Sequence, residues 1–435
     1  MLTREENELI CRVGPGTPMG ETMRRYWLPA CASSQIAGPD SDPLRVRLLG
    51  ENFVAFRDTN GQAGVLDELC MHRGASLALG RVEDCGIRCL YHGWKFGVDG
   101  TIQETPNHSD ERFRQRFTAP AYPVREQGGL VWVYLGPRER QPPLPQFPFM
   151  LAPEPNRSVI RVNVHANYLQ LIEGGIDSSH VGILHSDSAR PDWANKTPAT
   201  KTDDYNPAAQ LVGDLAPTLE IENTDFGLHY AAIRRVGDGQ STVNIRITPF
   251  VLPFGRIIPP GTFTVFEVPA DDEHTSTFLC FHGPQPVNRE RVIGVLGLDD
   301  ARFWQESDCT YRASWEDGFL QLQDRGAMRR RDSWSGLRGL EQEDATISLS
   351  MGPIYDRSRE HVVPADRAVI RARRLLFESM RRVERGEDPI GAFPATDFSK
   401  LRAPDQNLSA NERWQTLVPD HVLAADPTAE LEPVG

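Results

Sequence analysis

Residues 70–94, CMHRGASLALGRVEDCGIRCLYHGW, carry more chemical information than any other part of the chain. They contain a cysteine and a histidine in the pattern Cys70-x-His72, then sixteen residues, then a second pair in the pattern Cys89-x-x-His92. Glycines at positions 74, 86 and 93 stand where tight loops need residues that accept a positive φ. Two loops that each present one thiolate and one imidazole predict a metal site.

The ligand set favours a binuclear iron–sulfur cluster of the Rieske type, in which Cys70 and Cys89 bind one iron and His72 and His92 bind the other. A zinc site would hold one tetrahedral ion, and zinc motifs usually keep cysteines and histidines in separate halves. Replacing two thiolates by neutral imidazoles raises the reduction potential from about −400 mV to roughly −150 to +300 mV. Such a cluster accepts electrons from an NADH-driven reductase and passes them on. Four unconnected structural residues would not explain why the spacing and the glycines agree.

The composition is that of a globular protein with two or three domains, because the chain has 435 residues, 39% hydrophobic and 25% charged. No apolar run is long enough to span a membrane, and the first residues do not look like a cleavable signal, so we expect a cytoplasmic protein. The formal net charge of −13 argues against nucleic acid as a partner, since phosphate binding needs a basic surface. The seven cysteines show no disulfide framework, and Cys85 is expected to be a packed or partly exposed thiol.

Turn signals and proline content divide the chain into four parts. A short N-terminal helix is expected, with Thr3 as its N-cap and Glu6 completing a capping box. The following part alternates and turns often, as in LRVRLLGENFVAFRDTNGQAGVLDEL, and predicts an all-β domain with the metal loops at hairpin tips. The prolines of RERQPPLPQFPFMLAPEP predict a linker. The expected boundaries are 1–24 for the N-terminal helix, packed on the last domain, 25–137 for the Rieske domain, 138–155 for the linker and 156–435 for the last domain.

The last domain has a mixed pattern. SVIRVNVHA predicts a strand that leads into a helix around NYLQLIEGGIDSSHVGILH, and FGLHYAAIRRV and STVNIRITPFV alternate as strands do. In PADRAVIRARRLLFESMRRVERG, apolar residues at helical spacing predict a helix packed by one face. The expected fold class is therefore α+β, an all-β domain followed by an antiparallel sheet with flanking helices.

A second metal site is indicated by Asp177-x-x-His180-x-x-x-x-His185. Two histidines and one carboxylate on one face of a metal activate oxygen at non-haem ferrous iron. Residues five apart point about 140° from each other on a straight helix, so a break is required between the histidines, and Gly182 permits it. Asp177, three residues before His180, can hold the second nitrogen of that imidazole. The third ligand must be a downstream Asp or Glu. A hydrogen-bonded pair of core histidines is the alternative, which the cluster motif in the same chain disfavours.

The order of these motifs resembles the catalytic alpha subunits of the Rieske non-haem iron aromatic-ring-hydroxylating oxygenases. The segments NYLQLIEGGIDSSHVGILH and LEQEDATISLSMGPIYDRSREH are similar to the phthalate dioxygenase group, and the resemblance covers nearly the whole chain. It implies a catalytic domain of the helix-grip type. In the family the carboxylate ligand is an Asp in a helical E-D-x-x-x stretch. That position corresponds to Asp344, with Asp356 as the second choice, so the implied ligands of the mononuclear Fe(II) are His180, His185 and Asp344.

The resemblance also implies partners. A separate flavin and iron–sulfur reductase is expected, because the chain shows neither a dinucleotide-binding glycine fingerprint nor a plant-type ferredoxin motif. In the family the cluster and the iron of one chain are too far apart for direct electron transfer. The electron therefore crosses to a neighbouring subunit, which implies a homo-oligomer, either a trimer or stacked trimers (a hexamer). Asp177 would be the catalytic residue that bridges His92 of one subunit to His180 of the next.

The group resembled uses O2 to cis-dihydroxylate aromatic carboxylates, such as phthalate, isophthalate, chlorobenzoate or phenoxybenzoate. Arg246 is the preferred carboxylate contact, because the alternation in STVNIRITPF places it on the polar face of a strand, although an exposed arginine would fit the same pattern. Ser179 and Arg190 are further substrate-binding candidates, and Arg234 or Arg235 is a possible second arginine. Two other functions stay open: a Rieske monooxygenase or O-demethylase on a related acid, and an electron-transfer protein without oxygenase chemistry.

Overall fold

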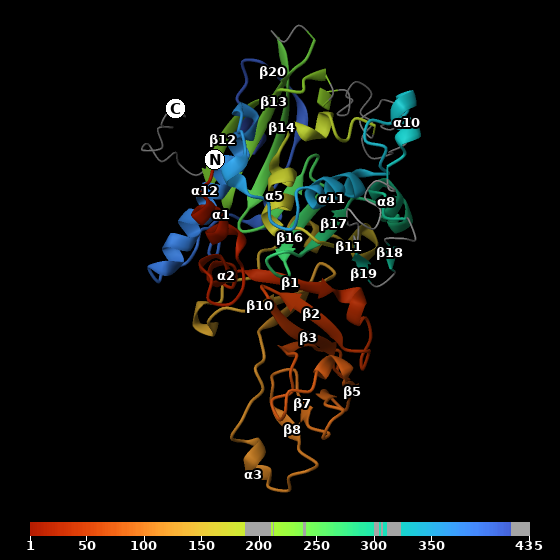
Figure 1. Ribbon diagram of the computed structural model, residues 1–435, viewed down its shortest axis with the longest axis vertical. Helices are drawn as coiled ribbons and strands as arrows, with labels where there is room; N and C mark the ends of the chain where they lie inside the picture. Colours follow the sequence, from red (N-terminus) through yellow and green to blue (C-terminus); the bar gives the residue numbers. More distant parts are fainter. Residues whose placement is uncertain are drawn as a thin grey trace.

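The computed structural model describes residues 1–187, 210–211, 213–237, 241–299, 304–305, 308–310 and 323–418. The molecule is elongated, with the domain of the two cluster loops at one end and a large sheet with its helices at the other (Figure 1). The strand pair β1 and β10 lies between these ends. This arrangement confirms the α+β class. None of the helices in the described ranges is both long and apolar enough to cross a membrane.

The described residues form α-helices of 4 to 18 residues, and their strands gather into four sheets. The α-helices are α1 (Arg4–Cys11), α2 (Pro18–Met23), α3 (Glu111–Arg114), α4 (Pro148–Leu151), α5 (Tyr168–Ile176), α8 (Arg289–Leu296), α10 (Arg325–Arg330), α11 (Leu340–Ser350) and α12 (Arg367–Glu384). The strands before residue 135 are β1 (Trp27–Ala32), β2 (Leu44–Leu48), β3 (Glu51–Arg57), β4 (Ala63–Asp67), β5 (Arg81–Glu83), β6 (Gly86–Arg88), β7 (Lys95–Phe96), β8 (Ile102–Glu104), β9 (Val124–Gln127) and β10 (Leu130–Tyr134). The later strands are β11 (Arg157–Val164), β12 (Thr218–Thr224), β13 (Gly227–Arg235), β14 (Thr242–Val251), β15 (Gly255–Ile258), β16 (Phe263–Pro269), β17 (Thr275–His282), β18 (Trp304–Gln305), β19 (Asp308–Thr310) and β20 (Asp405–Ser409).

The N-terminal helix α1 begins at the predicted cap. The Thr3 hydroxyl accepts a hydrogen bond from the backbone N–H of Glu6 at 3.1 Å, and the Glu6 carboxylate accepts one from the N–H of Thr3 at 2.8 Å. The two bonds satisfy donors that the first helical turn leaves free, so the capping box is confirmed. At the other end of α1, the Tyr168 hydroxyl donates to the carbonyl of Ile10 at 2.7 Å and ties the helix to α5 of the second domain.

Three antiparallel sheets, β1-β10-β9, β2-β3-β4 and β5-β6-β7-β8, make up the first domain. The two turns predicted between β2, β3 and β4 are present, with Gly50 at φ +80° and Gly61 at φ +79°. A positive φ is the conformation that favours glycine in tight hairpins. β5–β8 form a small sheet toward one end of the molecule (Figure 1). The second cluster loop connects β6 and β7 of this sheet, and the first lies between β4 and β5.

The second domain is built on a ten-stranded sheet with the order β12-β13-β14-β15-β16-β17-β11-β19-β18, with β20 paired to β14. The pairs are antiparallel except β11 with β19. In β11, buried and half-buried positions alternate, as expected for a strand with one face on the core. β20, from near the C-terminus, brings Asp405 opposite Arg246 of β14.

Helices cover this sheet and position the second metal site. α5 packs on β16 and lies beside α11 and α12 (Figure 1). The terminal helix predicted from apolar spacing is α12, and its buried residues fall on one face, which confirms that prediction. These buried residues are Ala368, Val369, Ala372, Arg373, Leu375, Leu376, Ser379 and Met380.

The proline-rich segment 138–155 is more ordered than a simple linker. It contains the short helix α4, and the side chains of Phe147 and Phe149 are buried in the main hydrophobic core. The indole of Trp27 donates to the carbonyl of Pro142 at 2.8 Å. Proline prevents regular structure here, but it does not prevent apolar side chains from packing between the two domains.

Candidate metal centres

The two cluster loops have the same backbone design. In each loop the cysteine carbonyl accepts a hydrogen bond from the N–H of a glycine four residues later, from Gly74 to Cys70 at 2.8 Å and from Gly93 to Cys89 at 3.0 Å. The two glycines have φ of +73° and +74°. Because only glycine adopts this conformation without strain, these residues shape the loops that hold the ligand side chains.

The side chains of these loops converge on one small region. Cys70 and Cys89 are 3% and 2% exposed. The ring centroids of His72 and His92 are 4.5 Å apart. Both Nδ1 atoms are buried and have no hydrogen-bond partner among the described residues. Buried polar atoms without a partner are rare, so two facing imidazole nitrogens left free beside two thiols fit a metal cluster.

Burial and the neighbouring thiol Cys89 raise the pKa of Cys70 to about 11. Without a nearby cation this cysteine therefore keeps its proton at neutral pH. A metal binds cysteine in the deprotonated form and supplies the positive charge that two thiolates in this pocket require. The indole of Trp94 stacks on the ring of His72, with centroids 4.6 Å apart and planes 4° apart, and holds one imidazole in orientation.

The second site begins where α5 ends. The helix stops at Ile176, earlier than predicted, and Asp177 has extended backbone angles. The Asp177 carboxylate accepts hydrogen bonds from the backbone N–H groups of Ser179 and His180 at 2.8 and 3.1 Å. An aspartate that bonds the backbone ahead of it competes with the helix. The helix predicted around NYLQLIEGGIDSSHVGILH therefore ends before Asp177 and does not reach the histidines.

The histidines follow in a short 3-10 helix, His180–Gly182, and the turns after it. Gly182 is required for a different reason than predicted. A Cβ at this position would lie 2.2 Å from the carbonyl oxygen of Leu211, so glycine allows two chain segments to approach closely. Because the backbone turns here, the ring centroids of His180 and His185 are 5.1 Å apart.

The third side chain comes from α11. One ligand atom from each of His180, His185 and Asp344 lies within 4.8 Å of the others. Asp344 Oδ1 is 3.1 Å from Nε2 of His185 and 3.7 Å from Nε2 of His180. The structure thus brings together the three residues named from sequence, and two imidazoles and one carboxylate suit non-haem Fe(II). Asp356, the second choice, instead caps the 3-10 helix Arg357–Arg359 and takes no part in this cluster.

A carboxylate lies behind each imidazole. Asp177 Oδ2 is 3.3 Å from Nδ1 of His180, and Glu343 Oε2 is 2.7 Å from Nδ1 of His185. Both Nε2 atoms are therefore left to face Asp344, as metal-binding histidines require. Sequence reasoning missed Glu343. The available signal was only an acidic residue directly before Asp344, because the burial of Glu343 is visible in the structure alone.

These carboxylates set the electrostatics of the site. Desolvation lowers the pKa of His185, but Asp344 and Glu343 outweigh it and raise the pKa to about 10. For Asp177, burial opposes ionisation, yet the hydrogen bond and the charge of His180 hold the pKa below its ordinary value. The negative field that favours a proton on His185 is the field that attracts a divalent cation.

A buried ion pair lies beneath the site. Arg256 donates to Glu267 at 2.9 Å, and both side chains are at least nine-tenths buried. Gly175 of α5 packs directly on the guanidinium, because a Cβ there would lie 2.0 Å from Arg256 Cζ. Burial, with the nearby charges of Glu267 and Asp344, raises the pKa of Glu341 to about 8.

The predicted substrate residues have mixed surroundings. Arg246 donates to Asp405 at 2.7 Å and is largely buried, so it is not the exposed arginine that its pattern also allowed. Arg234, 1% exposed, donates to the carbonyl and the hydroxyl of Ser178 at 2.8 and 2.9 Å and thereby fixes the loop before His180. Ser179 is half-buried in the same loop.

The other two arginine candidates give no support for a substrate contact. Arg235 is 78% exposed and pairs with Asp214 at 3.2 Å. Arg190 lies outside the described residues. Of these arginines, Arg234 is the one that bonds the loop before His180. Arg246 lies two residues along the sheet from it, since Arg246 is paired with Ala232.

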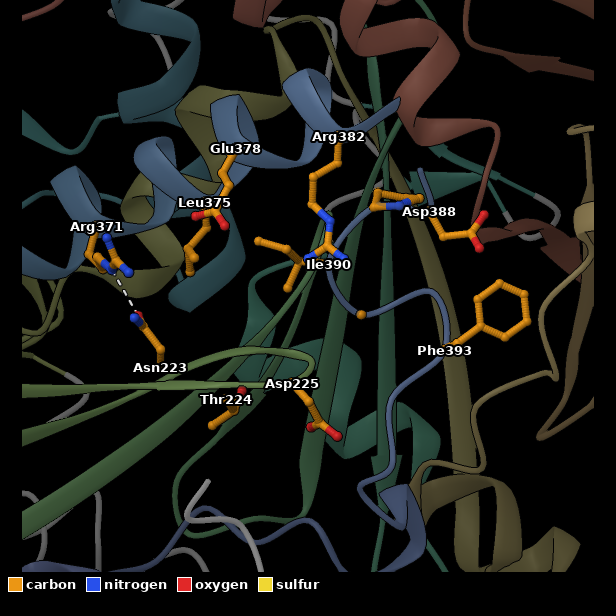
Figure 2. A pocket seen from close by; sticks show the side chains of 12 residues that line it. Asn223, Thr224, Asp225, Arg371, Leu375, Glu378, Arg382, Asp388, Ile390 and Phe393 are labelled. Carbon is orange, nitrogen blue, oxygen red and sulfur yellow. Dashed lines mark hydrogen bonds between the residues drawn. The ribbon is translucent and has the colours of Figure 1, made fainter. Parts of the chain in front are cut away.

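A separate cavity of about 560 Å³ lies between α12, the turn from β12 to β13 and the loop around Ile390 (Figure 2). Three of its charged groups have hydrogen-bond partners. Arg371 donates to Asn223 at 2.8 Å, Asp225 accepts from Thr396, and Asp388 accepts from Arg140. None of the three metal-site residues lines this cavity.

Comparison with known proteins agrees with this geometry. Residues 26–123 match the family described as the Rieske [2Fe-2S] domain, and residues 133–433 match the family described as LigXa C-terminal domain like. Together the two matches cover both ends of the molecule that carry the metal-binding side chains. The chain therefore contains a Rieske 2Fe-2S domain and a catalytic domain of mononuclear iron type.

Two relatives cover the chain almost completely. One is the oxygenase subunit of phthalate 4,5-dioxygenase of Pseudomonas putida, 36% identical over 98% of this chain and 97% of that protein. The other is the oxygenase subunit of 3-chlorobenzoate-3,4-dioxygenase of Comamonas testosteroni, 33% identical over 96% of this chain and 98% of that protein. Dicamba monooxygenase bound to dicamba shares the fold, with a TM-score of 0.56, 17% identity, and coverage of 84% of this chain and 99% of that chain. The chain belongs to the Rieske non-haem iron aromatic-ring-hydroxylating oxygenases, in the phthalate dioxygenase group, as a catalytic oxygenase subunit.

Proposed function

We propose that the chain is the terminal oxygenase that uses O2 and reductase-derived electrons to cis-dihydroxylate an aromatic carboxylate. The observation that carries this proposal is the convergence of His180, His185 and Asp344 on one point, in a chain that also has the cluster loops. The names of the two relatives, both oxygenase subunits for aromatic acids, support the substrate class and a separate electron-supplying component.

Each metal has its proposed ligands among the described residues. Cys70, His72, Cys89 and His92 would hold the 2Fe-2S cluster, and His180, His185 and Asp344 would hold Fe(II). When bound, the cluster supplies electrons one at a time and the ferrous iron activates oxygen beside the substrate. The protein contributes orientation, since Asp177 and Glu343 hold the rear nitrogens of the two imidazoles.

We infer that an arginine next to the histidine loop holds the substrate carboxylate, with Arg246 as the first candidate and Ser179 and Arg190 as further contacts. A guanidinium recognises a carboxylate through two parallel hydrogen bonds. Arg246 carries its own carboxylate partner, Asp405, on one Nη atom. The proposal therefore requires that substrate bind the remaining donors of Arg246 or replace Asp405.

We infer that the chain works as a homo-oligomer, a trimer or stacked trimers, in which an electron crosses between subunits through Asp177. Two groups of exposed apolar side chains support this. Leu69, Leu90 and Tyr91 are 60%, 61% and 56% exposed around the cluster loops. Ile347 of α11 and Met351, the residue that caps its C-terminus, are 41% and 44% exposed and follow Asp344 at helical spacing. Apolar side chains exposed on two different surfaces, one on each domain, suit a head-to-tail contact that closes into a ring.

The test is turnover with a flavin reductase, NADH and a panel of benzoates and phthalates under heavy-isotope oxygen, followed by mass spectrometry of the product. A cis-diol with two heavy oxygens is expected. One heavy oxygen with loss of a methyl or aryl group would assign monooxygenase or O-demethylase chemistry instead, once an unstable diol is excluded by trapping. A reducible cluster without incorporation from any substrate of the panel would contradict the proposed substrate class.

A further inference from the structure

The two imidazoles of the iron site are held from behind by carboxylates in very different surroundings. Asp177 is 23% exposed and shares its oxygens between His180 and two backbone N–H groups. Glu343 is 3% exposed, and its Oε2 lies 2.7 Å from Nδ1 of His185. The shorter contact is also the one that is sealed from water.

Glu343 is itself fixed by a chain of hydrogen bonds. The Ser335 hydroxyl donates to Glu343 Oε1, and the Ser335 oxygen accepts the backbone N–H of Leu337 at 3.1 Å. Each carboxylate oxygen therefore has one donor, so the side chain has no freedom to turn away from His185. A charged acceptor in a dry site binds its donor more strongly than a neutral one does.

The position of Glu343 in α11 makes this contact specific. Glu343 and Asp344 are consecutive, yet they approach opposite nitrogens of the same ring, Nδ1 at 2.7 Å and Nε2 at 3.1 Å. An acceptor on Nδ1 fixes the proton there and leaves the lone pair of Nε2 for a metal. The helix thus supplies one iron ligand and, from the adjacent residue, the group that orients a second ligand.

We propose that Glu343 is a positioning residue for iron: it fixes His185 as an Nε2 ligand and strengthens metal retention, independently of the electron route through Asp177. The inference rests on the proposed iron ligands. Carboxylates that bond a metal-binding histidine typically contribute a factor of about 10–100 in metal affinity. A buried, doubly bonded carboxylate such as Glu343 should act in this range, and its loss should alter the ligand field of the bound ion.

The test is titration of the iron-free oligomer, with its 2Fe-2S cluster intact, with Fe(II) and with Co(II), whose visible spectrum reports ligand geometry. Glu343→Gln keeps the shape and removes the charge, and Glu343→Ala removes both. We expect affinity to fall about 10–100-fold in Glu343→Gln and further in Glu343→Ala, with a changed Co(II) spectrum and an unchanged cluster absorption. Ser335→Ala should show a smaller loss, because the bond to His185 remains.

The matched control is Glu341→Gln, the same change in the same helix at a carboxyl that is 8% exposed. It should bind metal within about twofold of the wild type and keep the Co(II) spectrum, because no hydrogen bond or ion pair among the described residues joins Glu341 to His180, His185 or Asp344. Equal losses in Glu341→Gln and Glu343→Gln would overturn the inference in favour of general electrostatics, and wild-type affinity in Glu343→Gln would also overturn it. If His185→Ala also retains metal, the ligand assignment fails instead, which separates the two outcomes.

Discussion

Oδ1 of Asp344 lies 3.1 Å from Nε2 of His185, although the two residues belong to distant parts of the chain. α11 and the loop after α5 meet at this point, and His180 completes the group. The site therefore exists only in the folded second domain. The cluster loops lie at the other end of the molecule (Figure 1), so the two metal sites can be removed one at a time.

Replacing a member of the three-residue site should remove the iron and leave the cluster. Asp344→Ala and His180→Ala are each expected to reduce iron to well below one equivalent and to abolish turnover, because two remaining ligands hold Fe(II) weakly. The 2Fe-2S absorption spectrum should stay at the wild-type intensity. Metal analysis and spectroscopy on the same sample check this. Full iron occupancy in either variant would show that the ion binds elsewhere.

Asp177→Asn should separate metal binding from electron delivery. The amide oxygen can still accept the backbone N–H of Ser179, whereas the N–H of His180, which bonds the other carboxylate oxygen, loses its acceptor. The loop is expected to keep its shape through the bond to Ser179 and through the hydrogen bonds of Arg234 to Ser178. The lost charge removes the partner of the His180 imidazole, and turnover should fall about 10–100-fold with both metals present. Stopped-flow absorption should show normal reduction of the cluster by the reductase and slow reoxidation with substrate and O2. Fast reoxidation would contradict the bridging role.

Adjacent glycines in α5 allow a sharp test of packing under the iron site. Gly175→Ala would place a Cβ 2.0 Å from Cζ of Arg256, which is held by Glu267 and has little room to move. We expect a loss of about 1–3 kcal/mol in the free energy of unfolding, typical of an overpacked core. Gly174→Ala meets no atom within 4 Å and should gain about 0.5–1 kcal/mol, because alanine loses less entropy than glycine in a helix.

Chemical denaturation of the two alanine variants under identical conditions measures the difference. Equal stabilities would mean that Arg256 moves freely, and that the ion pair beneath the site is less rigid than its burial indicates. Iron content is a second measurement, since α5 ends one residue before Asp177.

The sequence predicted the cluster loops well because their ligands are close together and carry their own turn residues. His72 and Gly74 need no distant contact to be recognised. The histidines of the iron site were found for the same reason. Asp344 required the family resemblance, because nothing local distinguishes it from other acidic residues at a helix start.

Other features depend on burial or on distant contacts, which a single sequence does not show. Glu343 is recognisable only once α11 is known to lie against His185. The end of α5 at Ile176 follows from a side-chain bond of Asp177 to the backbone, which helical periodicity does not reveal. Asp405 reaches Arg246 because β20 pairs with β14, and this partner could not be predicted from the strand alone.

Acid should loosen the second cluster loop through Glu104. Hydrogen bonds from Arg88 and Lys95 lower the pKa of Glu104 from an ordinary value of 4.5 to about 2. A carboxyl with a lowered folded pKa stabilises the fold fully above its unfolded value and loses that contribution as pH falls toward the folded value. Arg88 also donates to the carbonyl of Gly93 at 2.9 Å. The ion pair of Arg88 with Glu104 therefore stabilises the loop of Cys89 and His92.

The measurement for Glu104 is the rate at which cluster absorption decays between pH 7 and pH 3. Glu104→Gln should decay faster than the wild type near neutral pH, and the difference should narrow as the pH falls toward the pKa of Glu104, about 2, because the wild-type carboxylate becomes increasingly protonated. The difference in decay rate should be modest, because the Glu104 side chain is 41% exposed. High salt should reduce this difference further. A difference in decay rate between the two proteins that grows as the pH falls would contradict this prediction.

The pair Arg246–Asp405 makes a prediction about substrate charge. Arg246→Gln should raise KM for aromatic carboxylates about 10–100-fold, the range expected for a charge-assisted hydrogen bond, while KM for the corresponding neutral amides changes little. Asp405→Asn removes the carboxylate that Arg246 now holds and should lower KM for acids, most of all for dianions such as phthalate, because the guanidinium gains an uncompensated charge. Steady-state kinetics on matched acid and amide substrates tests both variants. If neither variant changes the ratio of KM for acid to KM for amide, Arg246 does not contact the substrate carboxylate, which leaves Arg234 beside Ser178 as the candidate.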